Sequence, residues 1–219
     1  MRPTTITAAA ARRSASSPPA CIRRAPVQIE LLELLHGAGA NVDGLPGGWQ
    51  PLMAALANGR PLAARWLADH GARMTLASAA GCGRLDLVQA LADATADELY
   101  QGLVFAAEYG HADVVEHLLH RGAEIARPGR QTPLHMAAHG GHVEIVKLLL
   151  ARRAPLEITN EYGGTVLGQA LWSAVHHTWD EANPTLDHAP IVNALVSAGA
   201  KVDPTWRTGI ARIDALLRG

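Results

Sequence analysis

The sequence predicts an all-α fold, built as a solenoid of short helix–turn–helix units. Segments of similar pattern follow one another from residue 27 to residue 203. In the clearest of them, two stretches with apolar residues at helical spacing flank a glycine. Hydrophobic residues make up 48% of the chain but aromatic residues only 4%. Small apolar side chains therefore dominate, which suits closely packed helices better than a β-sandwich, where aromatic and β-branched residues are enriched.

The clearest unit spans residues 131–154, with the sequence QTPLHMAAHGGHVEIVKLLLARRA. Thr132 can cap a first helix, and Pro133 occupies the first turn, where a missing N–H group costs nothing. Gly141 ends this helix and permits the turn. The second helix then repeats apolar residues at helical spacing, which predicts a buried stripe. The stripe consists of Ile145, Val146, Leu148 and Leu149.

The same pattern recurs elsewhere in the chain. It fits QPLMAALANGRPLAARWLADHGA at 50–72, TLASAAGCGRLDLVQALAD at 75–93 and GLVFAAEYGHADVVEHLLHRGA at 102–123. A last copy is split into TVLGQALWSA at 165–174 and IVNALVSAGA at 191–200. Before the first copy, VQIELLELLHGAGANVD at 27–43 contains only a convincing second helix.

These residues resemble the ankyrin repeat family. TPLHMAA followed by GGHVEIVKLLL is similar to a nearly complete ankyrin repeat, and GANVD, GAEI and GAKVD are similar to the ends of such repeats. The resemblance covers about residues 27–203 and implies an α-solenoid of ankyrin repeats. We expect a half repeat at 27–43 and full repeats near 49–74, 75–97, 98–125, 130–158 and 164–203. Residues 1–26 form an N-terminal arm, and residues 204–219 a C-terminal capping helix.

The spacing of the repeats is uneven. The turn residues Gly59, Gly83, Gly110, Gly141 and Ala174 lie at intervals that grow from 24 to 33 residues, whereas an ankyrin repeat has about 33. If the helices are intact, the missing residues come from the connections, or fingers, between repeats. We therefore expect short fingers in the N-terminal half and longer ones near 125–131 and 156–165.

The ends of the second helices also differ. Gly122 and Gly199 occupy the position that favours a left-handed residue after a helix. Arg153 replaces this glycine in the central repeat, which predicts a strained or altered cap.

Two further segments interrupt the regular pattern. Residues 175–190, VHHTWDEANPTLDHAP, form an insertion between the two helices of the last repeat; it is either a tolerated surface loop or a functional one. The capping helix is predicted from WRTGIARIDALLRG at 206–219. Its apolar face would consist of Ile210, Ile213 and Leu217, with Arg212 and Arg218 in water.

The N-terminal arm is basic, because the first 29 residues contain five arginines and no acidic residue. Three readings stay open: a disordered arm, a targeting segment, or a degenerate first helix for the half repeat. The whole chain has a net charge of −1, so nothing overall indicates nucleic acid. No segment approaches the ~20 apolar residues of a membrane span. Two cysteines in no paired motif and few lysines favour a cytoplasmic, bacterial protein.

The sequence contains none of the common motifs for nucleotide binding, serine hydrolysis or zinc binding, so we expect no enzyme activity, catalytic residue, cofactor or metal. His135 and His142 match histidines of the ankyrin pattern, which leaves only His139 unexplained by the scaffold. The insertion offers a weaker alternative, a metal site or an enzymatic centre without fixed geometry. It would be built from His176, His177, Asp180, Glu181, Asp187 and His188.

The resemblance implies that a partner protein binds at the finger tips and on the inner helices. Trp49, Tyr100 and Gln131 map just before first helices. The ends of first helices contribute Asn58, Glu108, Tyr109, His139, Trp172 and Ser173. Aromatic residues are frequent binding hot spots. Trp66 instead falls on the core stripe of a second helix. We expect a monomeric protein–protein interaction module; the alternative is a scaffold subunit of a larger assembly.

Overall fold

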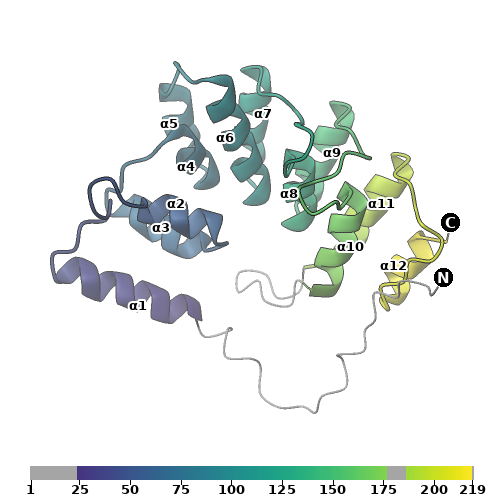
Figure 1. Ribbon diagram of the computed structural model, residues 1–219, viewed down its shortest axis with the longest axis horizontal. Coiled ribbons are helices and arrows are strands. Elements are labelled where there is room, and N and C mark those ends of the chain that lie inside the picture. The colour runs from purple at the N-terminus through teal and green to yellow at the C-terminus, as the bar shows by residue number, and fades with distance from the viewer. Residues whose placement is uncertain (1–23, 177–185, 219) are drawn as a thin grey trace, which may run out of the picture. The chain divides into compact units, whose positions relative to one another are not determined.

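The computed structural model describes residues 24–176 and 186–218, and within these residues the regular structure is entirely helical (Figure 1). The helices are α1 (Arg24–Gly37), α2 (Pro51–Ala57), α3 (Pro61–Asp69), α4 (Leu76–Gly81), α5 (Leu85–Ala90), α6 (Ala96–Glu108), α7 (Ala112–His120), α8 (Pro133–His139), α9 (Val143–Ala151), α10 (Val166–His176), α11 (Ala189–Ser197) and α12 (Ala211–Leu216).

The chain divides into two compact units, described separately. The N-terminal unit lies within Pro19–Glu124 and the C-terminal unit within Ile125–Gly219. In the N-terminal unit α1 packs against α3, and the pairs α2–α3, α4–α5 and α6–α7 each form a helix–turn–helix repeat. In the C-terminal unit the pairs are α8–α9 and α10–α11, and α12 packs against α11 (Figure 1). The predicted all-α repeat organisation is confirmed.

The starts of the first helices are set by local capping. Thr75 and Thr95 each form a capping box with the residue three positions later. Thr132 accepts a hydrogen bond from the His135 backbone N–H, and Pro133 follows at the first helical position, as predicted. These residues satisfy backbone groups that a short helix leaves unpaired at its start.

The turns after the second helices also follow the prediction. Gly122 and Gly199 adopt φ values of 86° and 96°. Arg153 adopts φ 60° at the corresponding position and is the one non-glycine residue with positive φ among the described residues. A side chain in this left-handed region is sterically disfavoured. The strained cap predicted for the central repeat is therefore confirmed, with the same backbone hydrogen bonds as at the other second helices.

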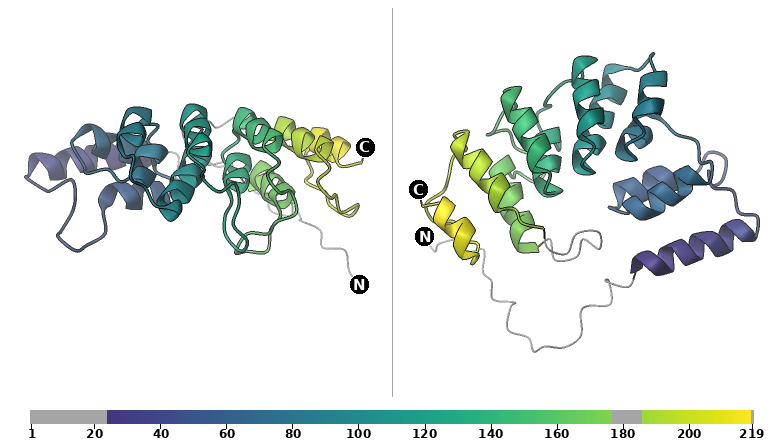
Figure 2. Two further views of the ribbon diagram at one scale, coloured as in Figure 1. Left: turned by 90° about the horizontal axis from the view of Figure 1, so that it is seen from above. Right: turned by 180° about the vertical axis from the view of Figure 1, so that it is seen from behind.

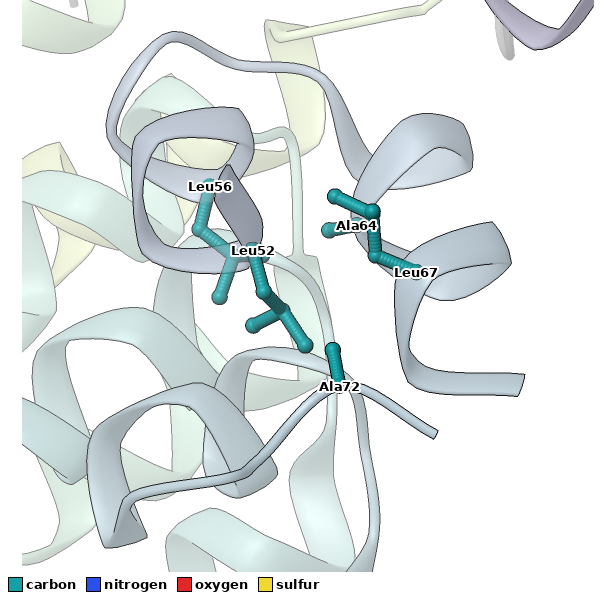
Figure 3. Packing of buried hydrophobic residues seen from close by; sticks show 5 residues of the cluster. All are labelled: Leu52, Leu56, Ala64, Leu67 and Ala72. Carbon is teal, nitrogen blue, oxygen red and sulfur yellow. The ribbon is translucent and has the colours of Figure 1, made fainter. Parts of the chain in front are cut away.

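Small residues allow the helices of the N-terminal unit to pack closely. Leu52 and Leu56 of α2 face Ala64 and Leu67 of α3, and Ala72 closes the cluster (Figure 3). A Cβ atom added to Gly102 of α6 would lie 2.5 Å from the Leu76 Cδ2 atom. Small side chains, which replace aromatic ones at these contacts, therefore let the helices approach each other closely.

The lengths of the fingers agree only partly with the prediction. The connections at 70–75 and 91–95 are short, and those at 121–132 and 152–165 are longer, as expected. The connection at 38–50 is also long and extends away from the helices of its unit, which was not expected in the N-terminal half (Figure 2). The assumption of intact helices is wrong for the second full repeat, because α4 and α5 have only six residues each.

Three predicted boundaries need correction. Helix α1 begins at Arg24, so the N-terminal arm is shorter than 1–26. The insertion is shorter than 175–190, because α10 continues to His176 and α11 begins at Ala189. The capping helix α12 covers 211–216 and not the whole of 204–219. Ile210 is its N-cap in extended conformation, so it lies outside the buried face that contains Ile213 and Leu217.

Candidate functional site

Three rings are stacked in the C-terminal unit, where α8 and α10 lie side by side. The Trp172 ring lies 4.8 Å from that of His176 and 6.2 Å from that of His139, between ring centroids. His176 follows Trp172 by one helical turn, and its Nδ1–H group donates to the Trp172 carbonyl oxygen at 2.8 Å. Trp172 keeps 42% of its surface exposed. We call His139, Trp172 and His176 the aromatic row.

A buried polar layer lies next to the aromatic row. Ser173 is fully buried, and its hydroxyl lies 3.0 Å from His139 Nδ1. The Gln169 side-chain amide lies 3.2 Å from the same nitrogen. His188 Nε2–H donates to the His139 carbonyl oxygen at 3.3 Å. Ser173 is thus wrongly predicted as a partner contact, because it lies on the inward side of α10; it positions His139 instead.

The finger before α10 is organised by Asn160, which sequence reasoning missed. The Asn160 Oδ1 atom accepts hydrogen bonds from the backbone N–H groups of Tyr162 and Gly164, at 3.0 Å and 2.9 Å. This is the local turn that an asparagine followed by glycines favours, so the signal was present in the sequence. The Asn160 side-chain amide also lies 3.4 Å from Gln131 Oε1. Tyr162 is 82% exposed on this finger.

His135 belongs to the framework and not to the surface. It is completely buried, and its Nε2–H group donates to the Gly164 carbonyl oxygen at 3.1 Å. Its Nδ1 atom therefore accepts from the Thr132 hydroxyl at 2.8 Å. Burial lowers the pKa of His135 below its usual range, although the bond to Gly164 opposes this. The framework role expected for this residue is confirmed.

In the N-terminal unit, Glu108 and Tyr109 lie at the end of α6. The Tyr109 hydroxyl donates to the Leu56 carbonyl oxygen. Burial raises the pKa of Glu108 to about 7 and that of Tyr109 above its usual range. Asn58 is exposed, and its side chain bonds back to the Ala54 carbonyl oxygen at 2.8 Å. Tyr109 is thus held by the scaffold, whereas Asn58 remains accessible.

Two aromatic residues that were predicted as partner contacts differ in exposure. Trp49 is 85% exposed on the finger at 38–50, and Leu45 on the same finger is exposed to a similar extent. Tyr100, in contrast, is 2% exposed. It was expected just before a first helix, but α6 begins at Ala96, capped by Thr95 and Glu98, and the extra turn places Tyr100 on the buried face. Its prediction as a partner contact is wrong.

The described residues contain no group of three or more His, Cys, Asp or Glu side chains that could hold a metal ion. His176 is stacked on Trp172 and His188 is buried, whereas His177, Asp180 and Glu181 of the insertion lie outside the described residues. Within those residues, no helix is both long and apolar enough to cross a membrane.

Comparisons with known proteins agree on the repeats. Residues 103–205 match the family model described as ankyrin repeats in three copies. The chain is 32% identical over 122 residues to the E3 ubiquitin-protein ligase hecd-1 of Caenorhabditis elegans, covering 53% of this chain and 4% of that protein. It is 31% identical over 140 residues to the ankyrin repeat and KH domain-containing protein mask-1 of the same organism, covering 58% and 5%.

A plant protein gives the same result. The chain is 38% identical over 109 residues to the probable E3 ubiquitin-protein ligase XBOS33 of Oryza sativa subsp. japonica, covering 44% of this chain and 21% of that protein. The chain spans only a small part of each relative, so the likeness concerns the repeats and not the rest of these proteins. Taken with the helix–turn–helix units and their glycine turns, these matches show that the chain belongs to the ankyrin repeat family.

Proposed function

We propose that this protein binds another protein, and that the C-terminal unit contacts it through the aromatic row and the exposed finger residue Tyr162. The observation that carries the proposal is the half-exposed indole of Trp172, which stacks with the rings of His139 and His176. A rigid, half-exposed tryptophan loses little conformational entropy on binding, and such residues dominate binding energy in many interfaces.

The chemistry of the row suits a polypeptide partner. The Trp172 ring stacks with two histidine rings and keeps 42% of its surface exposed, so a partner can meet the indole and its N–H group. The His176 Nδ1–H group donates to the Trp172 carbonyl oxygen at 2.8 Å, which fixes this ring beside the indole. Apolar contact together with the indole N–H donor fits backbone carbonyl groups and aliphatic side chains. Trp49, Asn58 and Gln131 remain further proposed contacts.

The proposal is tested by affinity purification from the native organism, with quantitative mass spectrometry of the captured proteins. Trp172→Ala is compared with Lys147→Ala, because Lys147 is exposed on the second helix α9 and pairs there with Glu144. A protein captured by the native chain and by the Lys147 variant, but lost with Trp172→Ala, supports the aromatic row as the site. A partner retained equally by both variants rules the row out.

The oligomeric state separates an interaction module from a scaffold subunit. We expect a monomer by size-exclusion chromatography with light scattering. A stable larger assembly of the purified chain would favour the scaffold subunit. Retention of catalysis or of bound zinc, iron or copper by the purified protein would favour the metal or enzymatic alternative.

A further inference from the structure

Helix α1 occupies the place of a second helix, without a first helix among the described residues. Its end repeats the geometry of the other second helices: the Ala40 N–H group bonds to the Leu35 carbonyl oxygen, as Ala123 does to Leu118 and Ala154 to Leu149. Gly39 has φ 87°, like Gly122. These bonds fix which residue of α1 corresponds to which residue of α7 and α9.

Several side chains of α1 are exposed, although the side chains at the equivalent positions of the complete repeats are buried. Leu118 and Leu149 are fully buried, whereas the equivalent Leu35 is 48% exposed. Ile145 is 2% exposed, whereas its equivalent Leu31 is 53% exposed. In the complete repeats the second helix packs against the first helix of its own repeat, but α1 packs against α3. The exposed face of α1 therefore lacks the cover that a first helix gives.

Helix α4 shows which residue types form a first helix that is buried against its neighbours. Helix α4 is a first helix with the sequence LASAAG after the capping residue Thr75, and all six of its residues are buried. Thr5–Ala11 has the sequence TITAAAA and matches TLASAAG at Thr75–Gly81 in its threonine, its branched apolar residue and two alanines. This segment, which lies outside the described residues, carries the same small apolar pattern.

Charge and chain length favour the same occupant. Arg12 and Arg13 follow the segment directly, whereas α1 carries Glu30 and Glu33 and no basic residue between Val27 and Leu35. The link from residue 12 to residue 23 can span up to about 40 Å when extended, so its length does not limit docking.

We propose that the exposed face of α1, formed by Val27, Leu31, Leu34 and Leu35, is the docking site for Thr5–Ala11 of the same chain, which supplies the first helix of the N-terminal half repeat. Docking of this segment would bury the exposed apolar face of α1 and so cap the first end of the N-terminal unit.

A cysteine pair tests the proposal in the full-length chain. The variants Cys21→Ser and Cys82→Ser first remove the two native cysteines. Ala9→Cys is then combined with Leu31→Cys or, as the control, with Glu33→Cys, which lies about 200° further round α1. A disulfide forms only between closely placed residues. We expect an intramolecular disulfide at least ~10-fold faster in the Leu31 pair, measured by mass spectrometry under mild oxidation.

Two results of this experiment overturn the proposal. Equal rates in both pairs, or no disulfide in either, show that the segment does not lie on this face. An intermolecular disulfide whose yield rises with protein concentration shows that a second copy occupies it.

Hydrogen exchange gives an independent test that leaves the α1 face intact. Ala9→Asp places a charge in the proposed contact, whereas Ser16→Asp places the same charge in the link. We expect amide exchange in residues 29–37 to become at least ~10-fold faster with Ala9→Asp and to stay unchanged with Ser16→Asp. Equal exchange in both variants overturns the proposal.

Discussion

Each unit contains a histidine–tryptophan–histidine group, and the two groups differ in the helix that carries them. In both, a histidine follows a tryptophan by one turn and donates its Nδ1–H group to the tryptophan carbonyl oxygen, at 2.7 Å from His70 to Trp66 and at 2.8 Å from His176 to Trp172. Trp66 lies on the second helix α3 and packs against the core cluster. Trp172 lies on the first helix α10 and is 42% exposed.

The distances between the rings also differ between the two groups. The rings of Trp66 and His70 are 3.7 Å apart, and His36 of α1 packs edge-on against both. The rings around Trp172 are further apart, at 4.8 Å and 6.2 Å. The closer group packs between the second helices α1 and α3, whereas the looser row is the surface proposed for a partner. The same local motif therefore lies in different surroundings according to which helix of the repeat carries it.

The largest expected effect is on the stability of the N-terminal unit. Trp66→Ala removes a large side chain packed on the core and should lower the free energy of unfolding of this unit by about 3 kcal/mol. The measurement is denaturant-dependent hydrogen exchange resolved by peptide. Trp49→Ala is the matched control, because Trp49 is 85% exposed, and a change within about 0.5 kcal/mol is expected. Equal losses in the two variants would contradict a packing role for Trp66.

In the C-terminal unit the corresponding substitution should act on binding. Trp172→Ala is expected to weaken the affinity for the partner by about 2 kcal/mol, or roughly 30-fold, while stability falls by about 1 kcal/mol. Isothermal titration with the identified partner, beside thermal unfolding of both proteins, separates the two effects. A loss of stability as large as that of Trp66→Ala, with unchanged affinity, would remove the distinction between the two groups.

Much of this architecture was predictable from the sequence, because its determinants are local. Thr132, Pro133 and Gly141 set the limits of α8 through capping and backbone conformation. The alternation of apolar stripes and glycine turns gave the number and order of the repeats. Trp66 was predicted on the core-facing stripe of a second helix, and it packs, partly buried, against the core cluster, because its place on that stripe is a matter of helical periodicity.

The errors concern positions where neighbouring residues shift a helix boundary. Tyr100 was expected in a short connection, but the capping box of Thr95 and Glu98 starts α6 earlier and turns Tyr100 inward. Ser173 adjoins Trp172 in sequence, yet successive helical residues point about 100° apart, so one is exposed and the other buried. The bond of Ser173 to His139 joins residues 34 positions apart, and sequence patterns do not encode such a pairing.

A third prediction is that the stability of the N-terminal unit, but not that of the C-terminal unit, depends on the titration of Glu108. Burial raises the pKa of Glu108 to about 7, whereas an unfolded chain releases this proton near 4.5. The folded state then binds more protons between these values, so stability falls as pH rises from about 4.5 to 7 and stays lower above. Glu108→Gln should remove this slope and add about 1 to 2 kcal/mol to the stability of the N-terminal unit at pH 8.

The control for this measurement is Glu116→Gln, because Glu116 is exposed on α7 of the same unit. Hydrogen exchange at pH 5 and pH 8 reports both units in one sample. The C-terminal unit should be unaffected by either variant. A pH dependence of the N-terminal unit that persists in Glu108→Gln would show that another group is responsible.

The smallest expected effect concerns the end of α9, where the C-terminal unit departs from the other repeats. Arg153 has φ 60°, at a position that Gly71, Gly122 and Gly199 occupy elsewhere. Arg153→Gly should relieve the strained backbone, but glycine also gains more freedom in the unfolded chain, so the net gain in stability is about 0.5 to 1 kcal/mol. The reciprocal Gly122→Arg should lower stability by about 1 kcal/mol. Thermal unfolding of both variants checks the pair, and a loss of stability with Arg153→Gly would mean that contacts of the arginine side chain outweigh the backbone strain.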